Sequence, residues 1–493
     1  MKMVWHIFRK DLRLLWWNAL MFTAVQLGQA GMQWRADREG QQDGVLAAML
    51  EVLVWLGGAF LTISVVQQDS LVGVRQDWLV RPIRRVDLLG AKLLFMGLVM
   101  IAPYGLIEFV VAVAHGLPWL ESLAASVWAS AFMVLVWYLP VMVLAVLTKS
   151  LAQAVGTAGM ALALVVAISS LPGQHGHLQV GGSAVTWVPT LIDVTWTSCG
   201  LAALLAMQYR RRATMKARLM AVGVGLVVLF VIPLLPFSTA MALQEKVSPL
   251  AREQLISFHP EDVPIRPEPN WNRAASANAQ AVWVPLRVDG LPADHWLKAD
   301  QTIVQLVGRD GVTHDVFARY PESTDKKREK TYLALDVPES FLGEGMTVRI
   351  EAEVIGTVMR PVASATLPLT REWVPLGGLG VCWAGVSEFV GNGMAMCLQP
   401  RGGPAVCVEY TLASSTAMPC DISYAPWGNR FAAGALQRFP GFISPPANPS
   451  VAPYPLAAID RTSHVQVRAY GVERHVRMRM VIPEIALGAW LAK

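Results

Sequence analysis

The chain has 493 residues, of which 54% are hydrophobic and only 16% are charged. Soluble globular proteins carry about 25% charged residues, so this composition excludes an ordinary soluble protein. The net charge of +5 is modest and excludes the strongly basic balance of a nucleic-acid-binding protein. Apolar residues are concentrated before about residue 238, which indicates a membrane-embedded first part.

Seven stretches are apolar enough, at roughly 18–25 residues each, to cross a hydrocarbon core about 30 Å thick. The first is interrupted by Asn18, Gln26 and Gln29, and the sixth contains Asp193, so six spans remain an alternative. The stretches run over Leu14–Gly31, Val45–Val66, Leu93–Ala114, Leu123–Leu147, Leu151–Leu171, Val188–Met207 and Leu219–Phe237.

Lysine and arginine in the short connections predict the orientation, because cytoplasmic loops carry an excess of both. One set of connections is rich in these residues, whereas the opposite set holds only Arg35 and Arg38. The bias predicts a cytoplasmic N-terminus and, with seven spans, places everything after Phe237 outside the cytoplasm.

The N-terminal segment is amphipathic at helical spacing. Cationic side chains recur at positions 2, 6, 9 and 13, and large apolar ones at positions 5, 8, 12 and 16. Such a helix lies in the membrane interface, with its cations on lipid phosphates. The alternative is that these residues simply begin the first span.

The connection between the second and third stretches, Gln67–Lys92, is too long for a plain turn. Its apolar residues keep helical spacing up to Pro82, which lacks the backbone donor that a helix interior needs. We expect a short helix, a break at Arg81-Pro82, and a second helix that leads into the third span. Three arginines would face water or a partner: Arg81, Arg84 and Arg85.

Two segments resemble the membrane subunit of ABC transporters of the type-2 exporter class (ABC-2 permeases), over about residues 1–237. They are Phe8-Arg-Lys-Asp-Leu-Arg13 and Arg81-Pro-Ile-Arg-Arg-Val-Asp-Leu-Leu-Gly-Ala-Lys92. The resemblance implies a permease in a bacterial inner membrane, working as a homodimer or with a second permease. It also implies a cytoplasmic ABC ATPase subunit that binds ATP and Mg²⁺ and docks on Asp77, Trp78, Arg81, Pro82, Arg84 and Arg85. The alternative is a basic loop that only fixes topology.

Several motifs are absent from the sequence. It contains no Gly-x-x-x-x-Gly-Lys-Ser/Thr phosphate loop, so ATP hydrolysis by that route requires a separate subunit. It also lacks His-Glu-x-x-His and Gly-x-Ser-x-Gly, and we expect no catalytic residues, no metal and no cofactor on this chain. Acidic residues within spans are costly. Glu51, Glu108 and Asp193 could line a substrate path, or hydrogen-bond between helices.

The C-terminal half changes from helical to alternating periodicity. Short alternating runs begin near Val282, Ile303, Tyr332 and Val348, separated by turn signals such as Asp289-Gly290. They predict an antiparallel β-sandwich, and two final strands are expected on either side of Gly471. We divide the chain into a membrane part (1–238), a linker (239–279), a sandwich-like region (280–372) and a cysteine-containing region (373–493).

Four cysteines lie in the last region: Cys382, Cys397, Cys407 and Cys420. In an oxidising compartment they predict two disulfides with three possible connectivities. Four free buried thiols are the alternative, and the absence of a Cys-x-x-Cys pair disfavours zinc.

The predicted fold is therefore a polytopic α-helical membrane bundle of six to seven spans, followed by an extracytoplasmic, mainly-β domain. The predicted function is the permease subunit of an ATP-driven exporter. The main alternative is a membrane anchor or sensor whose outer domain binds a ligand or partner.

Overall fold

A computed structural model gives the fold of the chain. The structure describes residues 2–39, 45–69, 84–169, 187–211, 213–228, 239, 242–243, 246, 256–260, 279–292, 294–309, 311–319, 330–338, 342, 347–386, 393–401, 403, 406–412, 415–417, 435–443 and 463–487.

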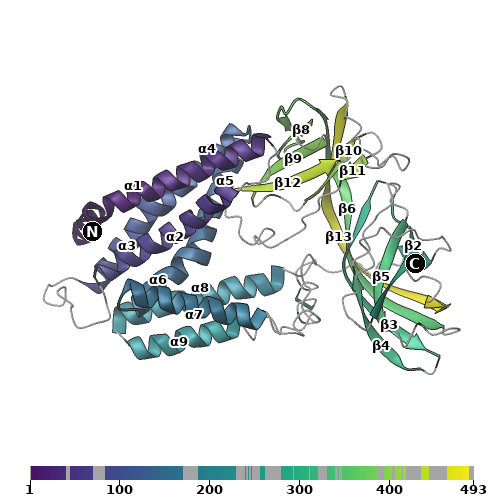
Figure 1. The fold of residues 1–493 in the computed structure, drawn as a ribbon, viewed down its shortest axis with the longest axis horizontal. Helices are drawn as coiled ribbons and strands as arrows, with labels where there is room; N and C mark the ends of the chain where they lie inside the picture. The colour runs from purple at the N-terminus through teal and green to yellow at the C-terminus, as the bar shows by residue number, and fades with distance from the viewer. Residues whose placement is uncertain are drawn as a thin grey trace.

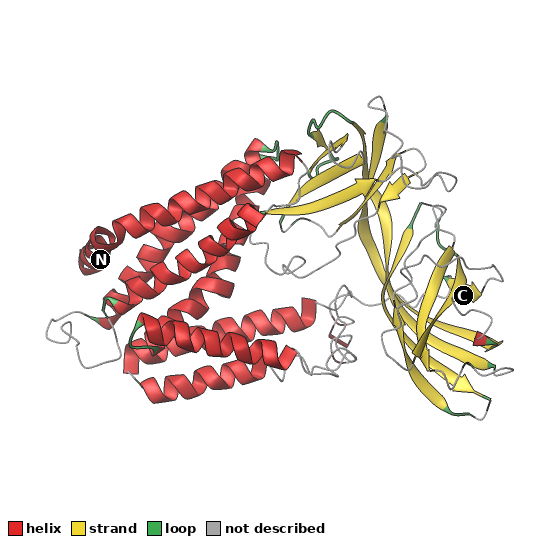
Figure 2. Cartoon of the chain, viewed as in Figure 1, coloured by secondary structure: helices red, strands yellow, loops and turns green. Residues whose placement is uncertain are grey.

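The molecule has two parts: a group of helices from the N-terminal half and a β region from the C-terminal half (Figures 1 and 2). The β region lies beyond one end of the helices, on the opposite side from the N-terminus (Figure 1). The change in periodicity near residue 280 therefore marks a real change of secondary structure.

Helix α1 (Lys2–Glu39) is continuous over 38 residues. The amphipathic segment and the first apolar stretch were expected as two elements, and they are one helix. No proline interrupts this range, so nothing in the sequence stops the helix. Phe8 is buried against Phe95 of α3, with ring centroids 6.3 Å apart, so this large apolar residue of the amphipathic segment packs within the protein.

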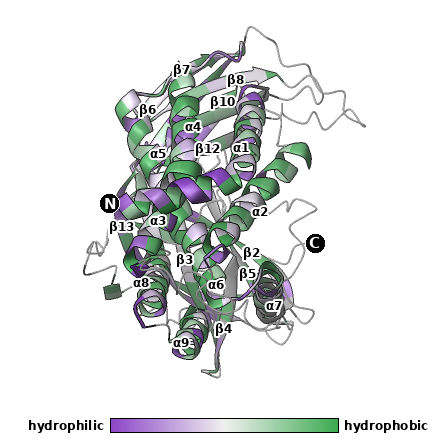
Figure 3. Ribbon diagram, turned by 90° about the vertical axis from the view of Figure 1, so that its left-hand side faces the viewer, coloured by the Kyte–Doolittle hydropathy of each residue, from purple (hydrophilic) through white to green (hydrophobic). Residues whose placement is uncertain are grey.

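Among the described residues, four helices are long and apolar enough to cross a membrane: Val45–Gln67, Arg85–Ala114, Trp119–Leu147 and Leu191–Arg211. The first is α2, which exposes a series of large apolar side chains, including Leu46, Met49 and Leu53. Figure 3 shows the hydrophobic colouring of α2. Lipid contact accounts for apolar side chains that face outward.

Two of these helices contain a π-helical segment. The first consists of α3 (Arg85–Phe95), η2 (Met96–Ile101) and α4 (Ala102–Ala114). The second consists of α5 (Trp119–Met133), η3 (Val134–Tyr138) and α6 (Leu139–Leu147). A proline follows each π segment by two residues, Pro103 and Pro140. Proline lacks an N–H and clashes with the carbonyl four residues back, so the wider turn accommodates it.

Further helices are α7 (Leu151–Ser169), α8 (Trp187–Arg211) and α9 (Thr214–Leu226). A shared hydrophobic core joins α1, α2, α3, α6, α8 and α9 and includes Phe95, Met100 and Tyr138. Gly58 lets Tyr138 approach α2, because an added Cβ would lie 3.1 Å from Tyr138 Cε1.

The β region contains two antiparallel sheets. The larger has the strand order β1-β2-β5-β4-β3-β6-β13-β10-β11, and the smaller β12-β9-β8-β7. The strands are β1 (Ser257–Pro260), β2 (Ala279–Asp289), β3 (Trp296–Gly308), β4 (Thr313–Arg319), β5 (Lys330–Pro338), β6 (Val348–Pro368), β7 (Val374–Pro375), β8 (Val381–Val386), β9 (Gly393–Pro400), β10 (Val406–Leu412), β11 (Ser415–Ala417), β12 (Leu436–Ile443) and β13 (His464–Ile485).

Strands β6 and β13 pair along nearly their whole length and run through both halves of the β region. The expectation of two strands around Gly471 is wrong, because β13 is one strand of 22 residues. Gly471 serves close packing: an added Cβ would lie 3.0 Å from Val362 Cγ1. The larger sheet therefore contains strands from both sides of the expected division at residue 372.

Alternation along the strands builds several hydrophobic clusters, two of which are larger than the others. One lies between the two sheets and includes Tyr410, Phe439 and Val467. The other lies on the half of the larger sheet that contains β2, β3 and β5 and includes Val284, Leu306 and Leu335. Gly290 follows β2 with a φ of 83°, a conformation that glycine adopts without strain.

Candidate functional site

A buried ion cluster joins α1, α3 and the turn that follows α2, at the end of the helical region away from the β strands (Figure 1). We define it as Lys10, Asp11, Asp69 and Lys92. Lys92 Nζ lies 2.7 Å from Asp11 Oδ2 and 2.7 Å from Asp69 Oδ2. Lys10 Nζ lies 2.9 Å from Asp69 Oδ1. Two lysines and two aspartates balance in charge, which is what burial requires of ionised groups.

Burial is unequal within the ion cluster. The side chain of Lys92 is 1% exposed and that of Asp11 is fully buried, whereas that of Lys10 is 41% exposed. Burial raises the pKa of Asp69, but the charges and hydrogen bonds of Lys92 and Lys10 outweigh it and lower that pKa below its usual value. Lys92 is therefore the central cation, and Asp69 stays ionised at neutral pH.

The ion cluster holds one end of the segment 70–83, and Arg85 holds the other. Asp69 directly precedes this segment. Arg85 follows it and donates from Nη1 to the carbonyl oxygen of Arg210, at the end of α8, at 2.9 Å. Gln67 Nε2 also donates to Thr148 Oγ1 at 3.2 Å. The two ends of the segment are thus tied to α1, α3, α6 and α8.

The residues expected to dock an ATPase fall mostly within this segment. Asp77, Trp78, Arg81 and Pro82 lie outside the described residues. Arg84 is exposed and has an extended backbone just before α3. Arg85 begins α3 and is half-buried.

A second polar cluster lies at the other end of α1, against the β region. We call it the joint and define it as Trp34, Asp37, His115, Trp383 and Arg438. Arg438 of β12 donates to Asp37 through Nε at 2.7 Å and through Nη2 at 2.9 Å. Trp383 Nε1 of β8 donates to the backbone carbonyl of Asp37 at 2.7 Å. The end of α1 therefore bonds to two strands of the smaller sheet.

His115, directly after α4, completes the joint. Its Nδ1 lies 2.8 Å from the carbonyl oxygen of Val111, and its Nε2 lies 3.7 Å from Asp37 Oδ2. Its ring lies 4.2 Å from that of Trp34 and 5.1 Å from that of Trp373, measured between centroids. Burial lowers the pKa of His115 below its usual value, so the ring is neutral at pH 7.

The three intramembrane acids have separate surroundings. Glu108 of α4 accepts a hydrogen bond from the backbone N–H of Ala435, just before β12, at 2.7 Å. It thus adds a second contact between helices and β region next to the joint. Glu51 of α2 is half-buried. Asp193 lies on α8 and accepts from Thr197 Oγ1 at 3.1 Å, within its own helix.

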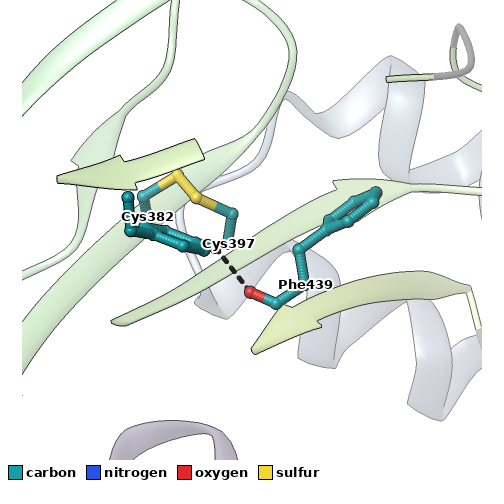
Figure 4. Close-up of a disulfide and its surroundings, with 4 residues drawn as sticks. Cys382, Cys397 and Phe439 are labelled. Atoms are coloured by element: carbon teal, nitrogen blue, oxygen red, sulfur yellow. Dashed lines mark hydrogen bonds between the residues drawn. A yellow bond between two sulfur atoms is a disulfide. The ribbon is translucent and has the colours of Figure 1, made fainter. Parts of the chain in front are cut away.

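Cys382 and Cys397 form a disulfide between neighbouring positions of β8 and β9 (Figure 4). Beside it, Tyr410 donates to the carbonyl oxygen of Phe439 at 2.5 Å. Of the three possible connectivities, this pairing leaves the one that would join Cys407 to Cys420. Cys407 is buried beside Met359, and Cys420 lies outside the described residues. Among the described residues, no group of three or more His, Cys, Asp or Glu could hold a metal ion.

Sequence reasoning missed the ion cluster and the joint. Lys92 was counted only as a loop cation. The one usable signal was Asp11, a single acid within a basic amphipathic stretch. The pairing of Asp37 with Arg438 spans 401 positions and leaves no local pattern. No protein family model, no curated protein and no solved structure matches the chain.

Proposed function

We propose that this chain is the membrane-spanning permease subunit of an ATP-driven transporter. A separate ATPase energises it by docking on the loop between the second and third spans, at Asp77, Trp78, Arg81, Pro82, Arg84 and Arg85. The observation that carries the proposal is the attachment of both ends of the segment 70–83. Asp69 is fixed to α1 and α3 through the ion cluster, and Arg85 to the end of α8. A force applied to a segment held in this way passes directly into several helices.

The proposal includes a topology. Six or seven spans cross a bacterial inner membrane, the ion cluster lies at the cytoplasmic side and the β region lies outside. The lysine and arginine bias supports this orientation. The disulfide between Cys382 and Cys397 also supports it, because structural disulfides persist in oxidising compartments and are rare in the cytoplasm. In this arrangement ATP and Mg²⁺ bind the partner subunit, and two permease chains form the pathway.

The test is affinity purification from membranes solubilised in mild detergents. The wild type is compared with the triple variant Arg81→Glu/Arg84→Glu/Arg85→Glu. A matched control reverses three exposed charges outside the segment, Lys149→Glu/Arg211→Glu/Lys216→Glu. The proposal expects a stoichiometric phosphate-loop ATPase with wild type and control but not with the triple variant. Absence of an ATPase from all three preparations would contradict it.

A second function, that of an anchored sensor, is favoured by the joint. The joint fixes the β region to α1 and α4 by an ion pair and hydrogen bonds, as a receptor that reports ligand binding to its helices would require. The same purification separates the two functions, because only the permease needs a docked ATPase.

A further inference from the structure

Helix α1 contributes residues to both the ion cluster and the joint. Lys10 and Asp11 belong to the ion cluster, and Trp34 and Asp37 belong to the joint. At 1.5 Å per residue, the helix rises about 39 Å between residues 11 and 37. The range is one α-helix without a break.

A neighbouring helix also connects the two clusters, but it is not a regular α-helix throughout. The helix from Arg85 to Ala114 also runs from the ion cluster to the joint, but it contains the π-helical segment Met96–Ile101. Sharp bends in helices occur at prolines and π turns. Of the two elements that connect the ion cluster with the joint, α1 is the one without a proline or a π-helical segment.

Both ends of α1 are fixed by buried charged groups. Breaking a buried charge pair on one side leaves an uncompensated charge, so such contacts have few alternative arrangements. At the ion cluster Asp11 is fully buried, and at the joint the Asp37 side chain is 3% exposed. A displacement of one end therefore carries the other end with it.

We infer that α1 is a rigid strut that transmits a displacement of the ion cluster, at the ends of segment 70–83, to the β region through Asp37, Arg438 and Trp383. The transmission itself requires no ATPase; only its use in transport rests on the proposed function. It gives the β region a mechanical role, since the sheet that receives Asp37 contains the disulfide-bonded pair β8 and β9.

Hydrogen–deuterium exchange on the full chain in lipid nanodiscs, without an ATPase, tests the inference. The perturbation is Lys92→Met, with Lys10→Met as a milder variant that keeps the two buried charges paired. Backbone amides of β12 should exchange about threefold faster or more in Lys92→Met, because the joint loosens. Amides of β3 and β5, far along the larger sheet, should keep the wild-type rate.

A second pair of variants tests whether α1 carries the effect. Leu20→Gly/Met21→Gly softens α1 at two exposed positions, and Val155→Gly/Met160→Gly does the same to α7. In the softened α1, Lys92→Met should no longer change exchange in β12, whereas softened α7 should leave the effect intact.

Unchanged exchange in β12 on Lys92→Met, with faster exchange in α3, would overturn the inference. Persistence of the effect in softened α1 would also overturn it. If Lys92→Met does not fold, the same readings are taken on Lys10→Met, for which a smaller rise in β12 is expected. The pull-down result stands apart from either outcome.

Discussion

The ion cluster and the joint are both built on buried charge, but they differ in how far apart their partners lie in the chain. The bonded lysine–aspartate pairs of the ion cluster are at most 81 positions apart, within the helical region. The joint pairs Asp37 with a residue 401 positions away. The ion cluster can therefore form within the helical region alone, whereas the joint forms only after the β region has folded.

The two clusters also differ in the polar group at their centre, which is a cation in the ion cluster and a neutral histidine in the joint. In the ion cluster Lys92 bonds two carboxylates at 2.7 Å each. In the joint His115 Nε2 is buried without a hydrogen-bond partner among the described residues and lies 3.7 Å from Asp37. The ion cluster is thus the more sensitive to loss of a charge, and the joint the more sensitive to acid.

The largest expected effect comes from removing the central cation. Lys92→Met leaves Asp11 buried without its short contact and should destabilise the protein by about 3–5 kcal/mol. Thermal unfolding in detergent measures this. Lys10→Met is the control, because its partly exposed charge contributes less than about 1 kcal/mol. Equal losses for the two lysines would contradict the assignment of Lys92 as the centre.

The next effect concerns the sheet that receives α1. Cys382→Ser/Cys397→Ser opens a bridge between residues 15 positions apart, which contributes about 3 kcal/mol for a loop of this length. The expected result is a lower unfolding temperature of the β region and faster proteolysis there. Cys199→Ser, outside the β region, should change neither. A double variant as stable as wild type would show that the bridge does not support the joint.

Arg438→Lys should have a smaller effect, because it keeps the charge but loses the two-pronged contact with Asp37. The cost should be about 1–2 kcal/mol in unfolding free energy. Arg438→Gln, which also leaves Asp37 without its cation, should cost more. If lysine and glutamine were equally tolerated, the ion pair would not be what holds α1 to β12.

The smallest expected effect is a dependence of the unfolding free energy on pH. Burial lowers the pKa of His115 and also that of His475 in β13. The unfolded state therefore takes up a proton first as pH falls through about 6.5, and stability declines with acidification. Each group contributes at most about 1.4 kcal/mol per pH unit. Unfolding temperatures between pH 7.5 and 5.5 should fall less steeply in His115→Gln than in the wild type. If the slope of unfolding temperature against pH were the same in His115→Gln as in the wild type, His115 would not contribute to the acid sensitivity.

Local patterns predicted much of the fold. Alternation predicted the strands that contain Val284, Val304 and Val337. Asp289-Gly290 predicted the turn that follows the first of these strands. The patterns failed where a residue had a use that only packing reveals. Gly471 resembled a turn, but it is the point where β13 approaches Val362. The π segments before Pro103 and Pro140 were not predicted, because hydrophobicity does not distinguish a π turn from an α turn.

The candidate site was less predictable than the fold. The basic loops and the intramembrane acids were visible, but their partners are set by tertiary contacts. Glu108 was expected to line a path or bond between helices, and it accepts a hydrogen bond from the β region. Charge pairing between distant segments leaves no period in the sequence, so Asp11 with Lys92 and Asp37 with Arg438 required the structure.

Site-specific photo-crosslinking in cells tests most directly whether a separate ATPase docks beside Arg84, as we propose. A photoreactive amino acid replaces exposed Arg84, and a second strain carries it at exposed Lys216 as the control. We predict that the photoreactive residue at position 84 captures a protein with a phosphate-loop sequence, identified by mass spectrometry. The residue at position 216 should capture much less of this protein. Capture of no such ATPase from position 84, with efficient crosslinking to other proteins or lipids there, would contradict it.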